Sequence, residues 1–452
     1  MGITHTIPQA PGALPLLGHA LPLRRDVLAF MVSLPAHGDV VRIKVGPASA
    51  LVVCDPDLVQ QVLVDDRTFD KGGPLFDRGR EVMGNGLITC PHRDHRRQRR
   101  LTQPAFQAQR MPAYAAVMSK EIAEATGRWS DGATIDVLAA MQTITARTTM
   151  ATMFAGTADA SLTGLLADFN VFLHGVYQRM FLPPLLLKLP TPGNRRYQQA
   201  RARLLHTISL IVESHRARGE SGEDLLSMLL AASEDGQGLS DAEITDQVMS
   251  FFVAGMETTA AILAWALHHL AQRPDLEARL HAEVDTVVPQ GEPATFDLLP
   301  RLELTSRIIT EILRLYPPGW MLTRVATTDT DLAGYPVKKG TTVVYSPYLI
   351  HHQAALYPDP ERFDPDRWAG QATRGRNSAL IPFGGGARKC IGDTFGLNEA
   401  ALALATIAAR WRLEPAPGTT VRPAPAATLN PHGLTMRTTA RHVPRPIAPR
   451  PA

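Results

Sequence analysis

Residues 383–392 constrain the chain more than any other stretch, because they place a single cysteine, Cys390, among four glycines. Glycines let a backbone turn tightly and approach a flat ligand closely. Residues 394–411 carry a helical pattern, so Cys390 would lie at a helix N-terminus, where backbone N–H groups and the helix dipole lower the pKa of a thiol. Arg388 would add positive charge nearby. A thiolate in this setting suits a soft or borderline metal, including haem iron, whereas a buried free cysteine would simply pack as a small apolar side chain.

Five of these ten positions form the pattern F-x-x-G-x-R-x-C-x-G. This pattern resembles the haem-binding signature of the cytochromes P450. The resemblance implies that Cys390 is the metal ligand and that the cofactor is haem b (iron protoporphyrin IX). The haem would be bound without covalent attachment, because the sequence contains no Cys-x-x-Cys-His. The resemblance also implies that Phe383, Gly384, Arg388 and Gly392 contact the haem, and that Arg388 helps to hold a propionate.

The composition is that of an ordinary globular protein: 452 residues, of which 45% are hydrophobic and 20% charged, with a net charge of +3. Three cysteines do not suggest a disulfide framework, which favours a reducing cytosol. The N-terminus carries neither a run of about 18 or more apolar residues nor a basic stretch followed by an apolar core. We therefore expect no membrane anchor, no signal peptide and a cytoplasmic location.

The hydrophobic periodicity predicts a small β-unit followed by a long helical region. Residues 40–45 and 50–53 are expected to be strands, and residues 111–219 are mostly helical by pattern. Length alone suggests two or three domains. The resemblance instead implies a single domain over residues 11–437, mainly α with a smaller β-region, which is the cytochrome P450 fold. Residues 438–452 would form a loosely ordered tail rich in proline and arginine.

A long central helix is predicted between Ser240 and Pro274. Ser240 and Glu243 form a capping-box pattern at its start, and the proline ends it. Its middle, residues 254–259, is unusual, because a glycine costs about 1 kcal/mol in a helix interior and threonines are mediocre helix formers. A purely structural account is a kinked helix in which Thr258 bonds back to a carbonyl.

The same stretch matches the (A/G)-G-x-(D/E)-T motif with which cytochromes P450 activate oxygen. The resemblance implies that Glu257 and Thr258 relay protons during catalysis. Ala254 and Gly255 would border the haem, and Gly255 would leave room for oxygen against the helix.

Residues 92–100 contain five arginines and one aspartate. Such a run marks either a solvated helix face or a nucleic-acid site, and the arginines point in different directions on a helix. His95 and Arg99 share a face, and they resemble the His/Trp-x-x-x-Arg pair that holds haem propionates in the family. A positive surface for an electron donor would be formed by Arg96, Arg97 and Arg100. We expect no nucleic-acid partner.

Two further patterns support the resemblance. Glu311 and Arg314 form an E-x-x-R pair on an amphipathic stretch, and with Arg362 they resemble the structural Glu-Arg-Arg triad of the family. Arg324 fits the strand arginine that contacts a propionate.

Apolar residues dominate the segments that the resemblance assigns to the substrate pocket, and few polar side chains accompany them. Three softer patterns, at residues 39–46, 172–187 and 194–197, resemble bacterial sesquiterpene-oxidising P450s and favour a cyclic terpene of secondary metabolism over a macrolide, polyketide or fatty acid. The expected pocket walls are Phe76, Leu87, Phe172, Val176, Phe251, Phe252, Trp320, Met321 and Leu322.

The activity that the resemblance implies is a monooxygenase, which inserts one oxygen atom from O2 into a hydrophobic small molecule. Electrons would come from a ferredoxin and a ferredoxin reductase, because the chain has no flavin or iron–sulfur segment. We expect a monomer. Two alternatives remain: a peroxide-driven peroxygenase on the same fold, and a non-catalytic carrier of haem or lipophiles that would not need Glu257 and Thr258.

Overall fold

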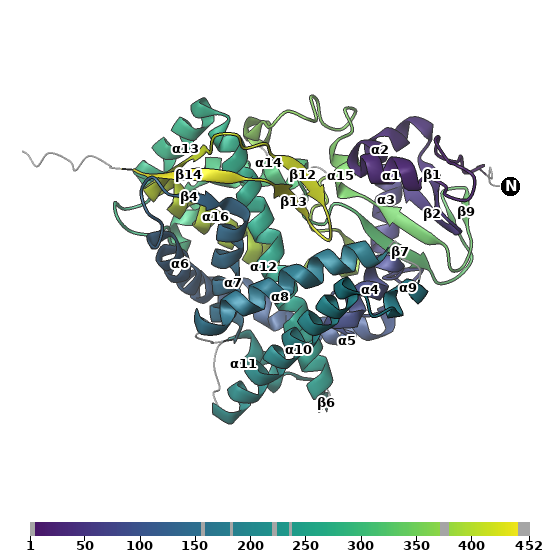
Figure 1. The fold of residues 1–452 in the computed structure, drawn as a ribbon, viewed down its shortest axis with the longest axis horizontal. Coiled ribbons are helices and arrows are strands. Elements are labelled where there is room, and N and C mark those ends of the chain that lie inside the picture. Colours follow the sequence, from purple (N-terminus) through teal and green to yellow (C-terminus); the bar gives the residue numbers. More distant parts are fainter. Residues whose placement is uncertain are drawn as a thin grey trace, which may run out of the picture.

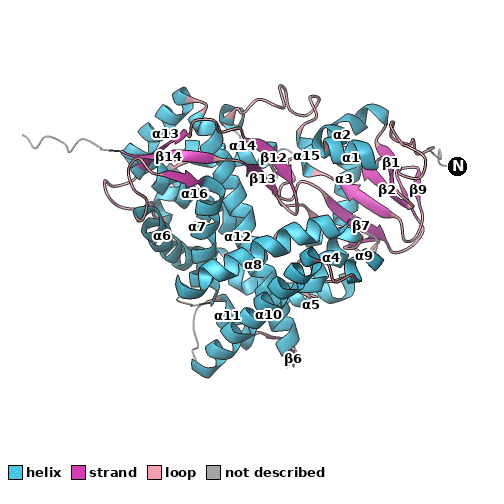
Figure 2. Ribbon diagram, viewed as in Figure 1, coloured by secondary structure: helices cyan, strands magenta, loops and turns pink. Residues whose placement is uncertain are grey.

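A central helix passes through a helix-rich body that carries a smaller sheet region on its N-terminal side (Figures 1 and 2). The computed structural model describes residues 5–154, 159–180, 184–218, 224–234, 237–370 and 379–441. The α-helices are α1 (Ala20–Arg25), α2 (Val27–Ser33), α3 (Pro56–Val64), α4 (Pro74–Met83), α5 (His92–Thr102), α6 (Met111–Gly127), α7 (Val137–Phe154), α8 (Asp159–Met180), α9 (Pro184–Lys188), α10 (Pro192–Arg218), α11 (Leu225–Ala231), α12 (Asp241–Ala271), α13 (Pro274–Val287), α14 (Glu303–Leu315), α15 (Pro347–His351) and α16 (Asp393–Arg410).

The strands form one larger sheet and several small ones. The larger sheet has the order β1-β2-β10-β7-β3, in which β2 and β10 are parallel and the other neighbours antiparallel. The strands are β1 (Val40–Val45), β2 (Ala48–Val53), β3 (Phe69–Asp70), β4 (Thr134–Asp136), β5 (Ser233–Glu234), β6 (Gln237–Gly238), β7 (Leu322–Ala326), β8 (Thr330–Leu332), β9 (Tyr335–Val337), β10 (Thr342–Tyr345), β11 (Trp411–Pro415), β12 (Arg422–Pro425), β13 (Leu429–His432) and β14 (Thr435–Ala440).

The elements expected from local patterns are present. β1 has the predicted bounds, and the strand expected at 50–53 begins two residues earlier, at Ala48. β14 continues to Ala440, past the predicted end of the domain at Arg437, because it pairs with β11 over Thr438 and its neighbours. Residues 442–452, most of the expected tail, lie outside the described residues.

Helix α12 begins where the capping box predicted. Ser240 accepts a hydrogen bond from the Glu243 backbone N–H, and the Glu243 side chain bonds back to the Ser240 backbone. The helix ends at Ala271, and Pro274 occupies the first turn of α13. At about 1.5 Å per residue, α12 is about 45 Å long. In the described part of the chain, it is the one helix long and apolar enough to span a membrane, but 78% of its most apolar window is buried inside the protein.

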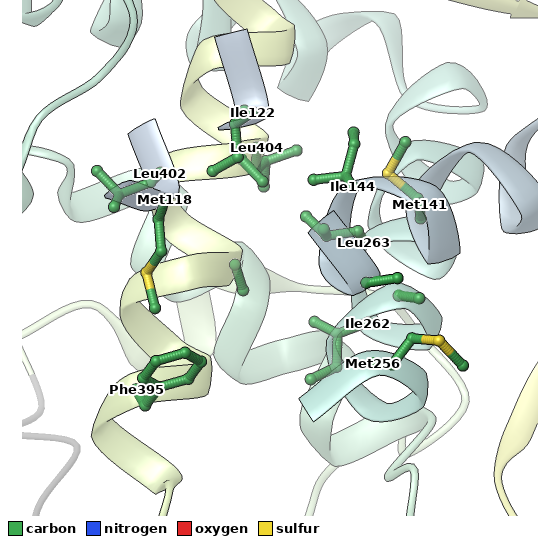
Figure 3. Packing of buried hydrophobic residues seen from close by; sticks show 14 of the residues in the cluster. Met118, Ile122, Met141, Ile144, Met256, Ile262, Leu263, Phe395, Leu402 and Leu404 are labelled. Carbon is green, nitrogen blue, oxygen red and sulfur yellow. The ribbon is translucent and has the colours of Figure 1, made fainter. Parts of the chain in front are cut away.

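The main hydrophobic core lies between α12 and three neighbouring helices (Figure 3). Side chains from α6, α7, α12 and α16 meet there and are almost completely buried, so each helix covers a face of the others. Labelled members are Met118, Ile122, Met141, Ile144, Met256, Ile262, Leu263, Phe395, Leu402 and Leu404.

A polar contact crosses this core. Glu399 of α16 is fully buried and accepts a hydrogen bond from Thr148 of α7, and its second carboxyl oxygen has no partner among the described residues. Burial raises the pKa of Glu399 to about 8, against the lowering effect of the hydrogen bond from Thr148. The carboxyl is therefore mostly protonated at neutral pH, which avoids an unpaired buried charge.

A second polar cluster braces α14. Glu311 and Arg314 are fully buried, and two guanidinium nitrogens of Arg314 donate to the two Glu311 oxygens at 2.9 and 2.8 Å. The third partner is Arg367, whose Nε donates to Glu311 Oε1 at 3.0 Å. Trp368 Nε1 donates to Oε2 at 2.9 Å.

The prediction of Arg362 as the third triad member was wrong. Its side chain is largely exposed and pairs with Asp364 at 2.6 Å, and only its backbone carbonyl reaches Arg314, at 3.2 Å. Asp364 caps the short turn Pro365–Trp368, and this turn directs Arg367 inward.

Arg367→Ala should destabilise the protein by about 1.5–3 kcal/mol, because Glu311 loses a charge-assisted hydrogen bond in a buried cluster. Arg362→Ala is the matched control, and it should change stability by less than about 0.5 kcal/mol, since its ion pair is exposed. Denaturant unfolding of both haem-loaded variants measures the difference. Equal effects would contradict the assignment of Arg367.

Glu399→Gln should change how stability depends on pH. The pKa of Glu399 is raised in the folded protein, so its contribution is fully present below about pH 4.5 and is lost as pH rises through about 8. The unfolding free energy of the native protein should therefore fall relative to that of the variant between pH 5 and 8, by on the order of 1 kcal/mol per pH unit at most. Parallel profiles in denaturant unfolding would show that Glu399 does not titrate in this range.

Candidate functional site

The loop before α16 holds Cys390 in a fixed place. The Cys390 backbone N–H donates to the Phe383 carbonyl at 2.9 Å, which closes the loop. Gly386 has a φ of +61°, and a Cβ there would lie 2.3 Å from the Leu63 carbonyl oxygen of α3, so only glycine permits this contact. The Cys390 side chain is accessible, although enough protein surrounds it for burial to raise the pKa of its thiol.

The thiol pKa departs from the prediction. Burial raises the pKa of Cys390, and the charge of Asp393 acts in the same direction, whereas the Gly392 N–H and the Arg99 and Lys71 cations lower it. Helix α16 begins at Asp393, so its dipole does not overcome the loss of hydration. A metal that binds Cys390 would therefore have to displace the thiol proton, because the thiolate is the form that ligates metals.

One face of α12 is open in its middle. Ala254 and Thr258 are partly exposed, together with the neighbouring Val253 and Gly255, and they lie four positions apart and so on one face of the helix. Thr258 Oγ1 donates to the Ala254 carbonyl at 2.7 Å, which is the back-bond expected from a structural account. A Cβ at Gly396 of α16 would lie 3.6 Å from Thr259 Oγ1, so this part of α12 lies beside the start of α16, close to Cys390.

Gly255 lets two helices come close together. A Cβ at this position would lie 2.8 Å from Thr149 Oγ1, so the glycine allows α7 to approach α12 closely. Its role in leaving room for oxygen stays a prediction.

Glu257 faces the core. Its Oε2 accepts a hydrogen bond from Gln142 at 2.9 Å, and its Oε1 accepts from Thr428 at 2.8 Å and Asn430 at 2.6 Å. Successive residues of a helix point about 100° apart, so Glu257 and Thr258 address different surroundings. The described contacts thus separate the acid from the alcohol of the predicted pair.

Cationic side chains gather near the cysteine loop. Arg324 is 2% exposed, and its Nε has no hydrogen-bond partner in the part of the chain that the structure describes. Lys71 was not predicted, because no sequence pattern marks it. Its Nζ donates to the Ile88 carbonyl at 2.7 Å, and burial with the charges of Arg324 and Arg388 lowers its pKa to about 7.

Arg388 is satisfied by the protein itself. It donates to Asp66 and Asp70 at 2.9 Å each and to the Cys90 carbonyl at 2.9 Å. These partners occupy the guanidinium that was predicted to hold a propionate. Arg388 therefore fixes the loop, and a propionate contact from it stays a prediction.

His95 and Arg99 of α5 lie near the same cysteine loop. His95 is buried, and burial together with the charges of Arg388 and Lys71 lowers its pKa to about 3, so the ring is neutral and can still donate a hydrogen bond. Arg99 donates to the Lys389 carbonyl at 2.5 Å, next to Cys390.

These residues fit a haem. An accessible thiol can ligate iron, and an open helix face lies beside it. Arg324, whose Nε lacks a hydrogen-bond partner, and the buried Lys71 would face the two carboxylates of the cofactor.

The predicted positive surface on α5 is smaller than expected. Arg97 pairs with Glu243 of α12 at 2.6 Å and donates to the Gly238 carbonyl. Arg96 and Arg100 are exposed.

The predicted pocket walls divide into two groups. Met321 and Leu322 are partly exposed, whereas the others are buried. Protein contacts account for several buried ones: Phe251 packs on Phe106, Phe252 on Phe169 and Phe172 on Tyr197, while Trp320 donates to the Ala426 carbonyl. Phe76, Leu87 and Val176 are buried on or beside α4 and α8. Their role as pocket walls stays a prediction.

Comparison with known proteins agrees with this geometry. A family model described as Cytochrome P450 matches residues 8–440. Pentalenene oxygenase from Streptomyces avermitilis is 47% identical over 437 residues, covering 96% of this chain and 97% of the relative. Cyclooctat-9-en-7-ol 5-monooxygenase from Streptomyces melanosporofaciens is 47% identical over 417 residues, covering 91% of this chain and 90% of the relative.

A solved structure, the haem domain of cytochrome P450DA, matches with a TM-score of 0.86 and 28% identity over 97% of this chain and 99% of that chain. The fold predicted from the sequence is thereby confirmed. The chain belongs to the cytochrome P450 family of haem-dependent oxidoreductases.

Proposed function

We propose that this cytochrome P450 binds haem b and oxidises a cyclic terpene, inserting one oxygen atom from O2 with electrons supplied by a ferredoxin and its reductase. The observation that carries the chemistry is the accessible Cys390 thiol beside the open Ala254–Thr258 face of α12. The substrate class rests on the relatives, two of which share 47% identity over nearly the whole chain and carry names of terpene-oxidising enzymes.

When bound, the haem supplies an iron centre that binds and activates O2. Cys390 would hold it as a thiolate, which pushes electron density toward the iron. Arg324 and Lys71 would hold its carboxylates by charge-assisted hydrogen bonds, with His95 and Arg99 beside them.

Thr258 is placed to handle protons. Its hydroxyl proton is donated to the Ala254 carbonyl, so its oxygen keeps lone pairs that can accept a hydrogen bond on the open face. Glu257, held by three donors, would keep this segment of α12 in place and would exchange protons only after a change of partner.

The apolar character of the remaining surroundings favours a hydrocarbon-like ligand. Met321 and Leu322 offer partly exposed apolar surface, and burial of such surface contributes about 25 cal/mol per Å². The exposed Arg96 and Arg100 support an acidic electron donor, whose docking would weaken with salt. We also propose a cytoplasmic location from the likeness to the bacterial relatives, which cell fractionation tests.

Cyclic terpenes added to the purified holoenzyme should shift the haem absorption to its high-spin position. Addition of NADPH, ferredoxin and ferredoxin reductase should then yield a product one oxygen atom heavier, at a rate that falls with ionic strength. Cys390→Ala is the control, and it should lose the red-shifted band of the reduced carbon monoxide complex. Mass spectrometry identifies the product.

Three outcomes would overturn parts of this proposal. A shift and product with a macrolide or fatty acid, but with no terpene, would refute the substrate class. Equal turnover with hydrogen peroxide alone would indicate a peroxygenase. Ligand binding without turnover under any condition would indicate a carrier.

Thr258→Ala should keep haem and substrate affinity while product per electron falls roughly tenfold or more, with the difference appearing as hydrogen peroxide, because proton transfer loses its positioned hydroxyl. Thr258→Ser retains a hydroxyl and should restore most of the coupling. NADPH consumption, peroxide and product are measured together. Unchanged coupling in the alanine variant would remove Thr258 from proton handling.

A further inference from the structure

A cavity separate from the predicted haem site lies among four helices. Its volume is about 670 Å³, and it opens between α4, the end of α8, α9 and the beginning of α10. Figure 1 shows α4 and α9 next to each other below the sheet, with α10 nearby. None of the predicted haem or pocket residues lines it.

Its lining consists mostly of hydrogen-bond donors. Five side chains are cationic and two are amides, whereas Glu81 is the one carboxylate among the described lining residues. The donors are Arg78, Arg179, Lys188, Arg195, Arg201, Asn194 and Gln198. Five positive charges against one negative charge leave an excess of four.

Arg179 is the buried centre of this lining. It is 6% exposed, its Nη1 donates to Asn194 Oδ1 at 2.7 Å, and its guanidinium lies over the Tyr197 ring at 4.3 Å. Its Nε forms a long ion pair with Glu81 Oε2 at 3.8 Å but makes no hydrogen bond among the described residues. A buried guanidinium with an incomplete set of hydrogen bonds is costly unless an anion completes it.

Glu81 cannot neutralise the cavity. One of its oxygens accepts from Arg78 at 2.7 Å, and the other accepts from the Tyr197 hydroxyl at 3.3 Å. Arg201 reaches only the Glu81 backbone carbonyl. Lys188 and Arg195 are exposed at the rim.

The N-terminus of α10 adds to the positive potential. The helix is 27 residues long and begins at Pro192, so Asn194 and Arg195 belong to its first turn. Backbone N–H groups at a helix start favour anions. The N–H groups of Asn194 and Arg195 already donate to Thr191, to its Oγ1 at 3.2 Å and its carbonyl at 2.9 Å, so the helix start contributes only through its dipole and the inference of a ligand rests on Arg179.

We infer that this cavity is a binding site for a multiply charged phosphate group. Arginine forks match phosphate oxygens in pairs, and the volume suits a small ligand. Both a soluble phosphate compound and a phospholipid headgroup carry this chemistry, and the exposed Leu189 at the cavity wall is compatible with a lipid. A bound phosphate would tie α4 to α8 and α10. The inference does not depend on the proposed activity.

Titration calorimetry of the holoenzyme with inorganic diphosphate tests the site. We expect binding that weakens with salt, with a rise in melting temperature at saturating diphosphate. Arg179→Gln should weaken binding at least tenfold. Arg203→Gln is the matched control, because Arg203 lies on α10, which contributes to the cavity, but pairs with Asp168 of α8 outside it, and it should leave affinity unchanged.

A second variant keeps the test valid if Arg179→Gln does not fold. Lys188→Gln combined with Arg195→Gln alters only exposed side chains and should also weaken binding several-fold. Vesicles of phosphatidylcholine with and without phosphatidylglycerol distinguish the sources: competition by the anionic vesicles alone identifies a lipid headgroup, and no competition identifies a soluble phosphate compound. Absence of diphosphate binding near physiological ionic strength, or equal binding by all variants, would refute the site.

Discussion

The near-complete burial of α12 determines where the site can be. Most of its side chains pack against neighbouring helices, including Met256, Ile262 and Leu263 in the core of Figure 3. Gly255 permits the close approach of α7. The neighbouring Ala254 and Thr258 stay partly exposed on one face of the helix. An open face on a core helix is costly unless a ligand fills it, which is what a flat apolar cofactor does.

The position of Cys390 depends on the same packing. Gly386 fixes the loop against α3, and Glu399 links α16 to α7. Contacts from two other parts of the chain therefore place the thiol. If Cys390 is the iron ligand, the fold rather than further ligands would orient the rest of the cofactor.

Features with local causes were predictable from the sequence. The β1 strand, the capping box of α12 and the cysteine loop each depend on residues within a few positions of one another. Features decided by distant contacts were not. Arg388 pairs with Asp66 and Asp70, about 320 positions earlier, and Lys71 joins the site through the same folding of the chain. The thiol pKa was mispredicted because loss of hydration, which depends on the whole fold, outweighs the helix terminus.

Prediction from the sequence also failed over a short distance, in the choice between Arg362 and Arg367 as the partner of Glu311. Each arginine stands two residues after a proline, Arg362 after Pro360 and Arg367 after Pro365, so the local sequence does not tell them apart. The cap by Asp364 decides, because it starts the turn that sends Arg367 inward and leaves Arg362 in solvent. Local backbone geometry thus determines which charge is buried.

Buried charges in this protein fall into two classes, and the difference is informative. The guanidinium nitrogens of Arg314 and Arg388 donate to carboxylates and carbonyls of the protein. These hydrogen bonds offset the cost of desolvating the two charges, so the role of both arginines is structural. Arg324 and Arg179 are also buried, yet each keeps an Nε without a hydrogen-bond partner among the described residues. Desolvating a guanidinium without completing its hydrogen bonds is unfavourable, so an incomplete one points to an anion from outside the chain. For Arg324 that anion would be a carboxylate of the haem, and for Arg179 the same reasoning leads to the phosphate group that we propose for the cavity between α4, α8 and α10.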